Sequence, residues 1–184
     1  MNKFGFISAF LTLVLFLFQY IPLGLYFGSE GPIYTWLSEF FGFSTNSWIN
    51  SFVQISIEIF SYQGKQIFLF GMSTNGTLQL WFDIHFLTFL ILFIITPLTI
   101  LLAFIGCAKE NTSGKKLINT NFFLVLLIFL YCIIGIPIYT KEILGIQFGF
   151  MEIFFYLHFG FYILLIDLIM AAIAKSKHPL QDKE

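Results

Sequence analysis

Five ionisable side chains stand within or beside long apolar runs: Asp83, His85, Glu152, His158 and Asp167. A charged group inside a bilayer costs at least ~2.5 kcal/mol, so such residues usually face protein or water and often mark a functional site. Carboxylates and imidazoles are also the groups that bind metals and carry protons. We therefore treat these five as the candidate polar positions.

Two of them, His85 and His158, have the residue type needed for haem binding between facing helices. His85 lies about three residues inside its predicted span and His158 about ten, which separates them by roughly 10 Å in height. Two axial ligands must meet at one iron, and the chain has no arginine to hold the propionates. We therefore predict no haem or other cofactor, and expect a histidine hydrogen-bonded between helices.

A second group of polar residues falls near one predicted membrane boundary and consists of Asp83, His85, Lys141, Glu142 and Glu152. One interpretation is a small metal or proton site between the ends of the second and fourth spans. The other is a ring of interfacial residues whose polar heads reach water. The spacing matches no known metal pattern, which favours the interfacial ring and predicts no metal site.

Asp167 is different because it lies roughly 10 Å inside the inner end of its predicted helix. It could belong to a proton or ion path, pair with Lys115 or Lys116, or accept hydrogen bonds from Ser, Thr or Tyr on a neighbouring span. His158 lies nine residues away and therefore on the opposite helix face. No continuous relay runs along this span, and the first and third spans carry no carboxylate, which disfavours transport.

Composition places the chain in the membrane class. Of 184 residues, 58% are hydrophobic and 10% are charged, whereas soluble domains carry about 25% charged residues. The net charge of −1, with lysine as the only strongly basic residue, excludes nucleic-acid binding. The two cysteines form no Cys-x-x-Cys pair. No catalytic or nucleotide motif is present, so we predict that the protein is not an enzyme.

Four apolar runs predict a single integral membrane domain over residues 1–184, built as an all-α four-helix transmembrane bundle. The predicted spans are 4–27, 82–105, 120–139 and 148–173. They leave an outer segment at 28–81, a cytoplasmic loop at 106–119 and a tail at 174–184. Pro97 is expected to kink the second span and Pro137 to end the third.

The outer segment predicts a small antiparallel β-sheet between the first two spans. Apolar residues alternate with polar ones over 53–59, turn residues follow at 63–64, a further strand is predicted at 66–70, and a second turn follows at 73–76. A helix over 46–62 remains an alternative, and 33–41 has the period of a helix lying on the membrane surface. Aromatic residues in this segment form the candidate partner surface: Trp36, Phe40, Trp48, Phe68 and Phe70.

Lysine positions predict the orientation. The predicted topology puts Lys3, the lysines of 106–119 and those of 174–184 on one side, and only Lys65 and Lys141 on the other. The positive-inside rule then places both termini in the cytoplasm and residues 28–81 outside, in what we take to be the cell membrane.

Four spans, cytoplasmic ends, a large first outer segment with strand patterning and a short second one resemble the claudin and peripheral-myelin-protein family in topology. That resemblance implies an extracellular sheet on a four-helix bundle that assembles side by side or across cells. The family's Gly-Leu-Trp signature and paired cysteines are not in the outer segment, so no functional residue is carried over.

Two functional hypotheses follow. The first is a non-enzymatic membrane protein that acts through assembly, either as an accessory subunit of a membrane complex or as a self-associating, claudin-like unit. Its partners are then the lipid bilayer and other membrane subunits or copies of itself. The alternative is a small ion-handling, proton-handling or redox protein that uses the intramembrane histidines and carboxylates.

Overall fold

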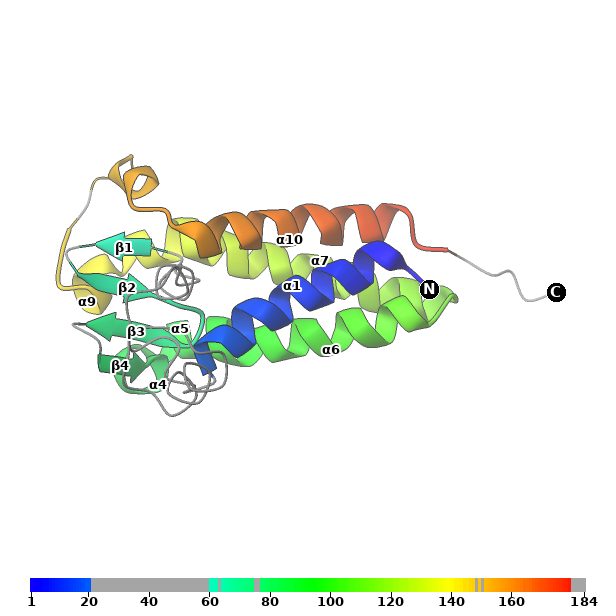
Figure 1. Ribbon diagram of the computed structural model, residues 1–184, viewed down its shortest axis with the longest axis horizontal. Coiled ribbons are helices and arrows are strands. Elements are labelled where there is room, and N and C mark those ends of the chain that lie inside the picture. The colour runs from blue at the N-terminus through cyan, green and yellow to red at the C-terminus, as the bar shows by residue number, and fades with distance from the viewer. Residues whose placement is uncertain (21–59, 63, 75–76, 148, 150, 180–184) are drawn as a thin grey trace, which may run out of the picture.

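The computed structural model describes residues 1–20, 60–62, 64–74, 77–147, 149 and 151–179. Within these ranges, long helices pack side by side as a bundle, and a small sheet lies at one end of it (Figure 1). Helix α1 begins and helix α10 ends at the opposite end. The chain is therefore mostly helical, with one small antiparallel sheet, as the sequence predicts.

The bundle helices are mostly apolar in sequence. They are α1 (Lys3–Tyr20); α5 (Phe86–Thr88), η1 (Phe89–Ile94) and α6 (Ile95–Ala108) in succession; α7 (Thr112–Leu130), η2 (Tyr131–Gly135) and α8 (Ile136–Ile138) in succession; and α10 (Phe159–Ser176). Three continuous stretches are long and apolar enough to cross a membrane: Phe86–Ala108, Thr112–Ile138 and Phe159–Ser176. These three helices identify an integral membrane protein.

Both long composite helices contain a π-helical segment just before a proline. η1 precedes Pro97 and η2 precedes Pro137. Proline has no N–H to donate to the preceding turn, and a local π segment is one way for a membrane helix to accommodate it. The Thr96 hydroxyl also donates to the Leu92 carbonyl, so the backbone around Pro97 stays hydrogen-bonded.

The third span begins earlier than predicted, at Thr112 rather than at residue 120. Asn111 caps the helix because its side chain accepts a hydrogen bond from the Gly114 N–H at 2.8 Å. Lys115 and Lys116 then lie on its exposed surface. Hydropathy detects only the apolar part of a helix, so it leaves these polar first turns in the predicted loop.

The fourth span begins later than predicted, at Phe159 rather than at residue 148. The described residues before it form irregular chain and a short 3₁₀-helix, η3 (Glu152–Phe155). Two of these residues pack within the fold: Ile153 is buried at 1% exposure, and the Tyr156 ring packs edge-on against Tyr62 at a centroid distance of 4.5 Å. Hydropathy alone cannot separate such packing from a membrane helix.

The described part of the sheet has four short antiparallel strands in sequential order: β1 (Phe60–Tyr62), β2 (Lys65–Ile67), β3 (Gly71–Thr74) and β4 (Thr77–Leu80). Thr74 pairs with Thr77, which places the second predicted turn correctly. The predicted strand at 66–70 is too long, because β2 ends at Ile67. The alternating run at 53–59 and the surface helix at 33–41 lie outside the described residues.

Residues 67–70, here called the inserted segment, fix the sheet to the bundle. All four side chains are at most 2% exposed. The Phe70 ring contacts Phe16 of α1 at 4.3 Å and Phe93 of η1 at 5.2 Å. Trp81 begins the short helix α4 (Trp81–Ile84), and its indole N–H donates to the Phe68 carbonyl at 2.9 Å. The sheet and bundle therefore share one core.

Candidate functional site

Asp167 of α10 forms the most deeply buried polar cluster that we find among the described residues. Its two carboxyl oxygens accept hydrogen bonds from the hydroxyls of Ser8 and Thr12, both at 2.5 Å. Ser8 and Thr12 are one turn apart on α1, so both face α10. All three residues are 0–2% exposed. Of the alternatives for Asp167, the hydroxyl partners on a neighbouring helix are confirmed.

This arrangement ties the first helix of the chain to the last. The cluster supplies the buried Asp167 carboxyl with two hydrogen-bond donors from α1, while the Thr12 hydroxyl also lies 3.1 Å from the Ser8 carbonyl of its own helix. The partners, Ser8 and Thr12, had no role in the sequence analysis. Their spacing of four residues on an apolar helix was the available signal.

Asn121 of α7 is a second buried polar residue that the sequence analysis did not identify. It is 0% exposed, and neither its amide nitrogen nor its amide oxygen has a hydrogen-bond partner in the structure. Most buried amides are paired, so an unpaired one requires an explanation. Helices α7 and α10 therefore each carry a buried polar side chain inside the bundle, Asn121 and Asp167 respectively.

At the sheet end, His85 links three parts of the chain. Its Nδ1 lies 3.0 Å from the Thr88 hydroxyl, and its Nε2 lies 3.2 Å from a carboxylate oxygen of Glu142. Glu142 belongs to α9 (Thr140–Ile143). The Thr88 hydroxyl in turn bonds to the Tyr131 hydroxyl on η2. A polar chain therefore runs from an exposed carboxylate to a tyrosine that is 7% exposed.

The remaining candidate polar positions lie apart from these clusters. Asp83 is exposed on the first turn of α4. The Glu152 carboxylate accepts a hydrogen bond from the Gly149 N–H at 3.0 Å and so closes its own turn. His158 is the half-buried residue that precedes α10, rather than a residue deep inside a span. Within the described ranges, no three His, Cys, Asp or Glu residues gather as a metal site.

The candidate partner surface has a different outcome. Phe68 and Phe70 are 2% and 0% exposed, so they belong to the core and are not available to a partner. Trp36, Phe40 and Trp48 lie outside the described residues. Among the exposed apolar residues at this end are Phe82, Phe86 and Ile138, and those of the projecting turn, residues 151–155, where Met151 is 72% and Phe155 is 84% exposed. This turn protrudes from the bundle beside the start of α10 (Figure 1).

At the opposite end, Asn2 holds three helices together. Its amide donates to the Ala174 carbonyl of α10 at 2.8 Å and lies 3.2 Å from Nδ1 of His178, while its backbone N–H donates to Cys107 of α6. Burial lowers the pKa of His178, opposed by the nearby backbone of Lys109 and Asn111. The nearby Lys115 ammonium and the N-terminal ammonium lower the pKa further.

A scan against protein-family models found no match, and searches of curated proteins and of solved structures found no significant match either.

Proposed function

We propose that this protein is a four-span integral membrane protein that works without catalysis, by assembling with neighbouring membrane proteins. α1 is the first span, and the sheet lies on the outer side of the membrane. The opposite end of the bundle, where α1 begins and α10 ends, faces the cytoplasm.

The packing of α1 supports its assignment as a span. At 1.5 Å per residue, its 18 residues extend about 27 Å, close to the ~30 Å hydrocarbon thickness. It packs against α6 and α10 along the bundle. The buried hydroxyls of Ser8 and Thr12 donate to Asp167, so the middle of α1 lies beside the middle of α10, a candidate span.

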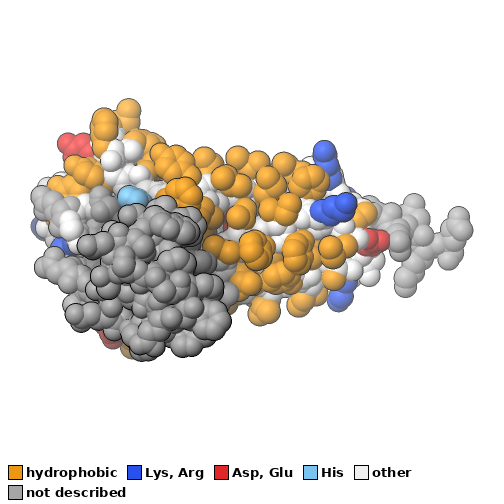
Figure 2. Space-filling view, viewed as in Figure 1, with side chains coloured by type: hydrophobic (Ala, Val, Ile, Leu, Met, Phe, Trp, Pro, Cys, Tyr) orange, Lys and Arg blue, Asp and Glu red, His pale blue; other side chains and the backbone are white. Residues whose placement is uncertain are grey.

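The distribution of lysines supports the orientation. Figure 2 shows apolar side chains along the visible face of the helices and basic side chains gathered at the end where α1 begins. Lys3, Lys115, Lys116, Lys175 and Lys177 are in this group by their places in the helices. An excess of lysine marks the cytoplasmic side.

The observation that carries the assembly proposal is the projecting turn. Met151 and Phe155 expose most of their surfaces beyond the end of α10, at the boundary where a chain leaves the hydrocarbon. Exposed aromatic clusters of this kind mark contact surfaces for other proteins. The turn points sideways from the bundle. A neighbour in the same membrane, either another subunit or a second copy, is therefore the partner that it would meet.

Photo-crosslinking tests this proposal. A photoreactive amino acid at position 155 should give a protein adduct in native membranes, whereas the same group at Leu101, a 57% exposed residue of α6, should give lipid adducts only. The double variant Met151→Ala/Phe155→Ala should lose the complex in native mass spectrometry, and Leu101→Ala/Phe123→Ala should keep it. Lipid adducts alone at position 155, with a monomeric protein, would exclude assembly through this turn.

A second candidate function is proton or ion handling, which the buried carboxyl of Asp167 and the unpaired amide of Asn121 favour. Purified protein in liposomes should then move protons or sodium ions, and Asp167→Asn should stop that movement without unfolding the bundle. Equal flux in both proteins, or no flux above that of empty liposomes, would reject this function.

A further inference from the structure

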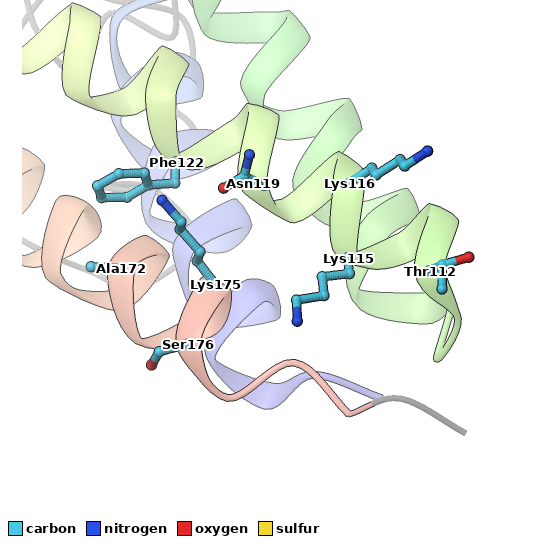
Figure 3. A pocket seen from close by; sticks show the side chains of 8 residues that line it. All are labelled: Thr112, Lys115, Lys116, Asn119, Phe122, Ala172, Lys175 and Ser176. Carbon is cyan, nitrogen blue, oxygen red and sulfur yellow. The ribbon is translucent and has the colours of Figure 1, made fainter. Parts of the chain in front are cut away.

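A pocket of about 830 Å³ lies between the first turns of α7 and the last turns of α10 (Figure 3). It is lined by Thr112, Lys115, Lys116, Asn119 and Phe122 from α7, and by Ala172, Lys175 and Ser176 from α10. Residues three or four apart on a helix share one face, so each helix turns a single face to the pocket.

The pocket is positively charged. Three of its lining residues are lysines, and none carries a carboxylate. The ion pairs identified among the described residues, Met1 with Glu110 and His85 with Glu142, do not involve these lysines. In Figure 3, Lys115 and Lys175 extend into the space between the two helices, while Lys116 points away. Two ammonium groups from different helices therefore face one space.

The deeper wall of the pocket is apolar. Phe122 and Ala172 form it, and the Lys175 ammonium lies 4.5 Å from the ring centroids of both Phe122 and Phe123. These cation–π contacts hold the charge at the edge of the hydrocarbon. Phe123 is 51% exposed on the lipid-facing side. The pocket thus combines a basic mouth with an apolar floor at the level where two candidate spans end.

We propose that this pocket binds an anionic phospholipid, with the lipid phosphate between Lys115 and Lys175 and an acyl chain against Phe122 and Ala172. Asn119 supplies a neutral hydrogen-bond donor for a glycerol or head-group oxygen. Basic pockets between membrane helices on the cytoplasmic side are suited to such head groups. A soluble phosphate would use the ammonium groups but not the apolar floor, so the structure favours the lipid.

The proposal rests on the membrane embedding of the four helices but not on assembly through the projecting turn. A monomeric protein that fails the crosslinking test above can still bind lipid here. A protein that assembles can equally lack this site.

Native mass spectrometry of the detergent-solubilised full chain tests the proposal with phosphatidylglycerol and phosphatidylcholine as probes. The pocket variant is Lys115→Gln/Lys175→Gln. The matched control is Lys3→Gln/Lys109→Gln, which removes the same charge at the same end but outside the pocket. Since one interfacial lysine changes binding about fivefold, the pocket variant should bind phosphatidylglycerol about 25-fold more weakly, while the control should change by less than about threefold.

Wild-type protein should also prefer phosphatidylglycerol to phosphatidylcholine, and excess glycerol phosphate should not displace the lipid. Equal losses in both variants, or no preference for the anionic lipid, would overturn the proposal, because the lysines would then act only as general surface charge. Displacement by glycerol phosphate would also overturn it in favour of a soluble phosphate ligand. Circular dichroism of both variants checks that the helices are intact.

Discussion

At the scale of single residues, the chemistry of this protein is decided by which polar groups find partners inside the bundle. Asp167 is paired with two hydroxyls, His85 with a carboxylate and a hydroxyl, and Asn121 has no hydrogen-bond partner in the described structure. The residue types were visible in the sequence. The partners were not, because pairing between residues far apart in the chain depends on how the helices face one another.

Removing the partners of Asp167 should destabilise the bundle. In the variant Ser8→Ala/Thr12→Val, the carboxyl group stays buried but loses both hydrogen bonds, at an expected cost of about 2–4 kcal/mol. The melting temperature in detergent measures this loss.

The triple variant that adds Asp167→Leu should recover much of the stability, since it removes the buried polar group as well. If the double variant is as stable as wild type, the cluster does not hold α1 in place.

His178 predicts a pH dependence at the end of the bundle where α1 begins and α10 ends. Its folded-state pKa is lowered, chiefly by burial, so the unfolded chain takes up a proton that the folded protein does not. Stability from this residue is therefore present above the unfolded pKa of about 6.5 and is lost as the pH falls below it. Protonated Nδ1 also cannot accept the hydrogen bond from Asn2.

Melting temperatures between about pH 5.5 and 7.5 measure this effect. The variant His178→Gln should show a flatter dependence of melting temperature on pH than wild type. His85→Gln is the control, because His85 lies beside the Glu142 carboxylate. An unchanged slope in His178→Gln would assign the pH dependence to other groups.

At the scale of elements, the sheet is fastened to the bundle by the inserted segment and by close backbone approach next to it. A Cβ atom at Gly71 would lie 2.1 Å from the Gln79 carbonyl oxygen of the neighbouring strand, so no side chain fits there. Glycine is needed at this position for space, while its φ angle is ordinary.

Gly71→Ala should therefore separate β3 from β4 and destabilise the protein by about 2 kcal/mol or more. The matched control is Gly145→Ala, where a Cβ meets no neighbour but the positive φ of 69° adds about 1 kcal/mol of strain. Chemical unfolding in detergent compares them. A smaller loss for Gly71→Ala than for Gly145→Ala would contradict the close packing of the strands.

Element boundaries show where sequence patterns succeed and where they fail. The turn residues at 73–76 predicted the β3–β4 hairpin because turn chemistry is local. Hydropathy found the three spans but misplaced the start of α10, since the apolar residues described before it lie partly in the core, as Ile153 does, and partly on the exposed projecting turn, as Phe155 does. It also missed the first turns of α7, where the signal was the Asn111 cap rather than hydropathy.

At the scale of the whole molecule, the proposed topology has a direct test because both native cysteines are buried, Cys107 at 2% and Cys132 at 0% exposure. Single cysteines replace Gln79 on β4 and Ser113 at the start of α7, both exposed. A membrane-impermeant thiol reagent on intact cells should label Gln79→Cys and not Ser113→Cys. Permeabilised cells should show both labelled, and the reverse pattern would invert the topology.

The cluster at Asp167 joins residues 159 positions apart in the chain. Synthesis at about 5–20 residues per second separates the appearance of Ser8 from that of Asp167 by roughly 8–30 s. During this interval the Thr12 hydroxyl can still donate to the Ser8 carbonyl on its own helix, but neither hydroxyl of α1 has the Asp167 carboxyl as its acceptor. The contact between α1 and α10 can therefore form only after α10 has been synthesised, and truncations before α10 should be recognised by membrane quality control as orphaned helices.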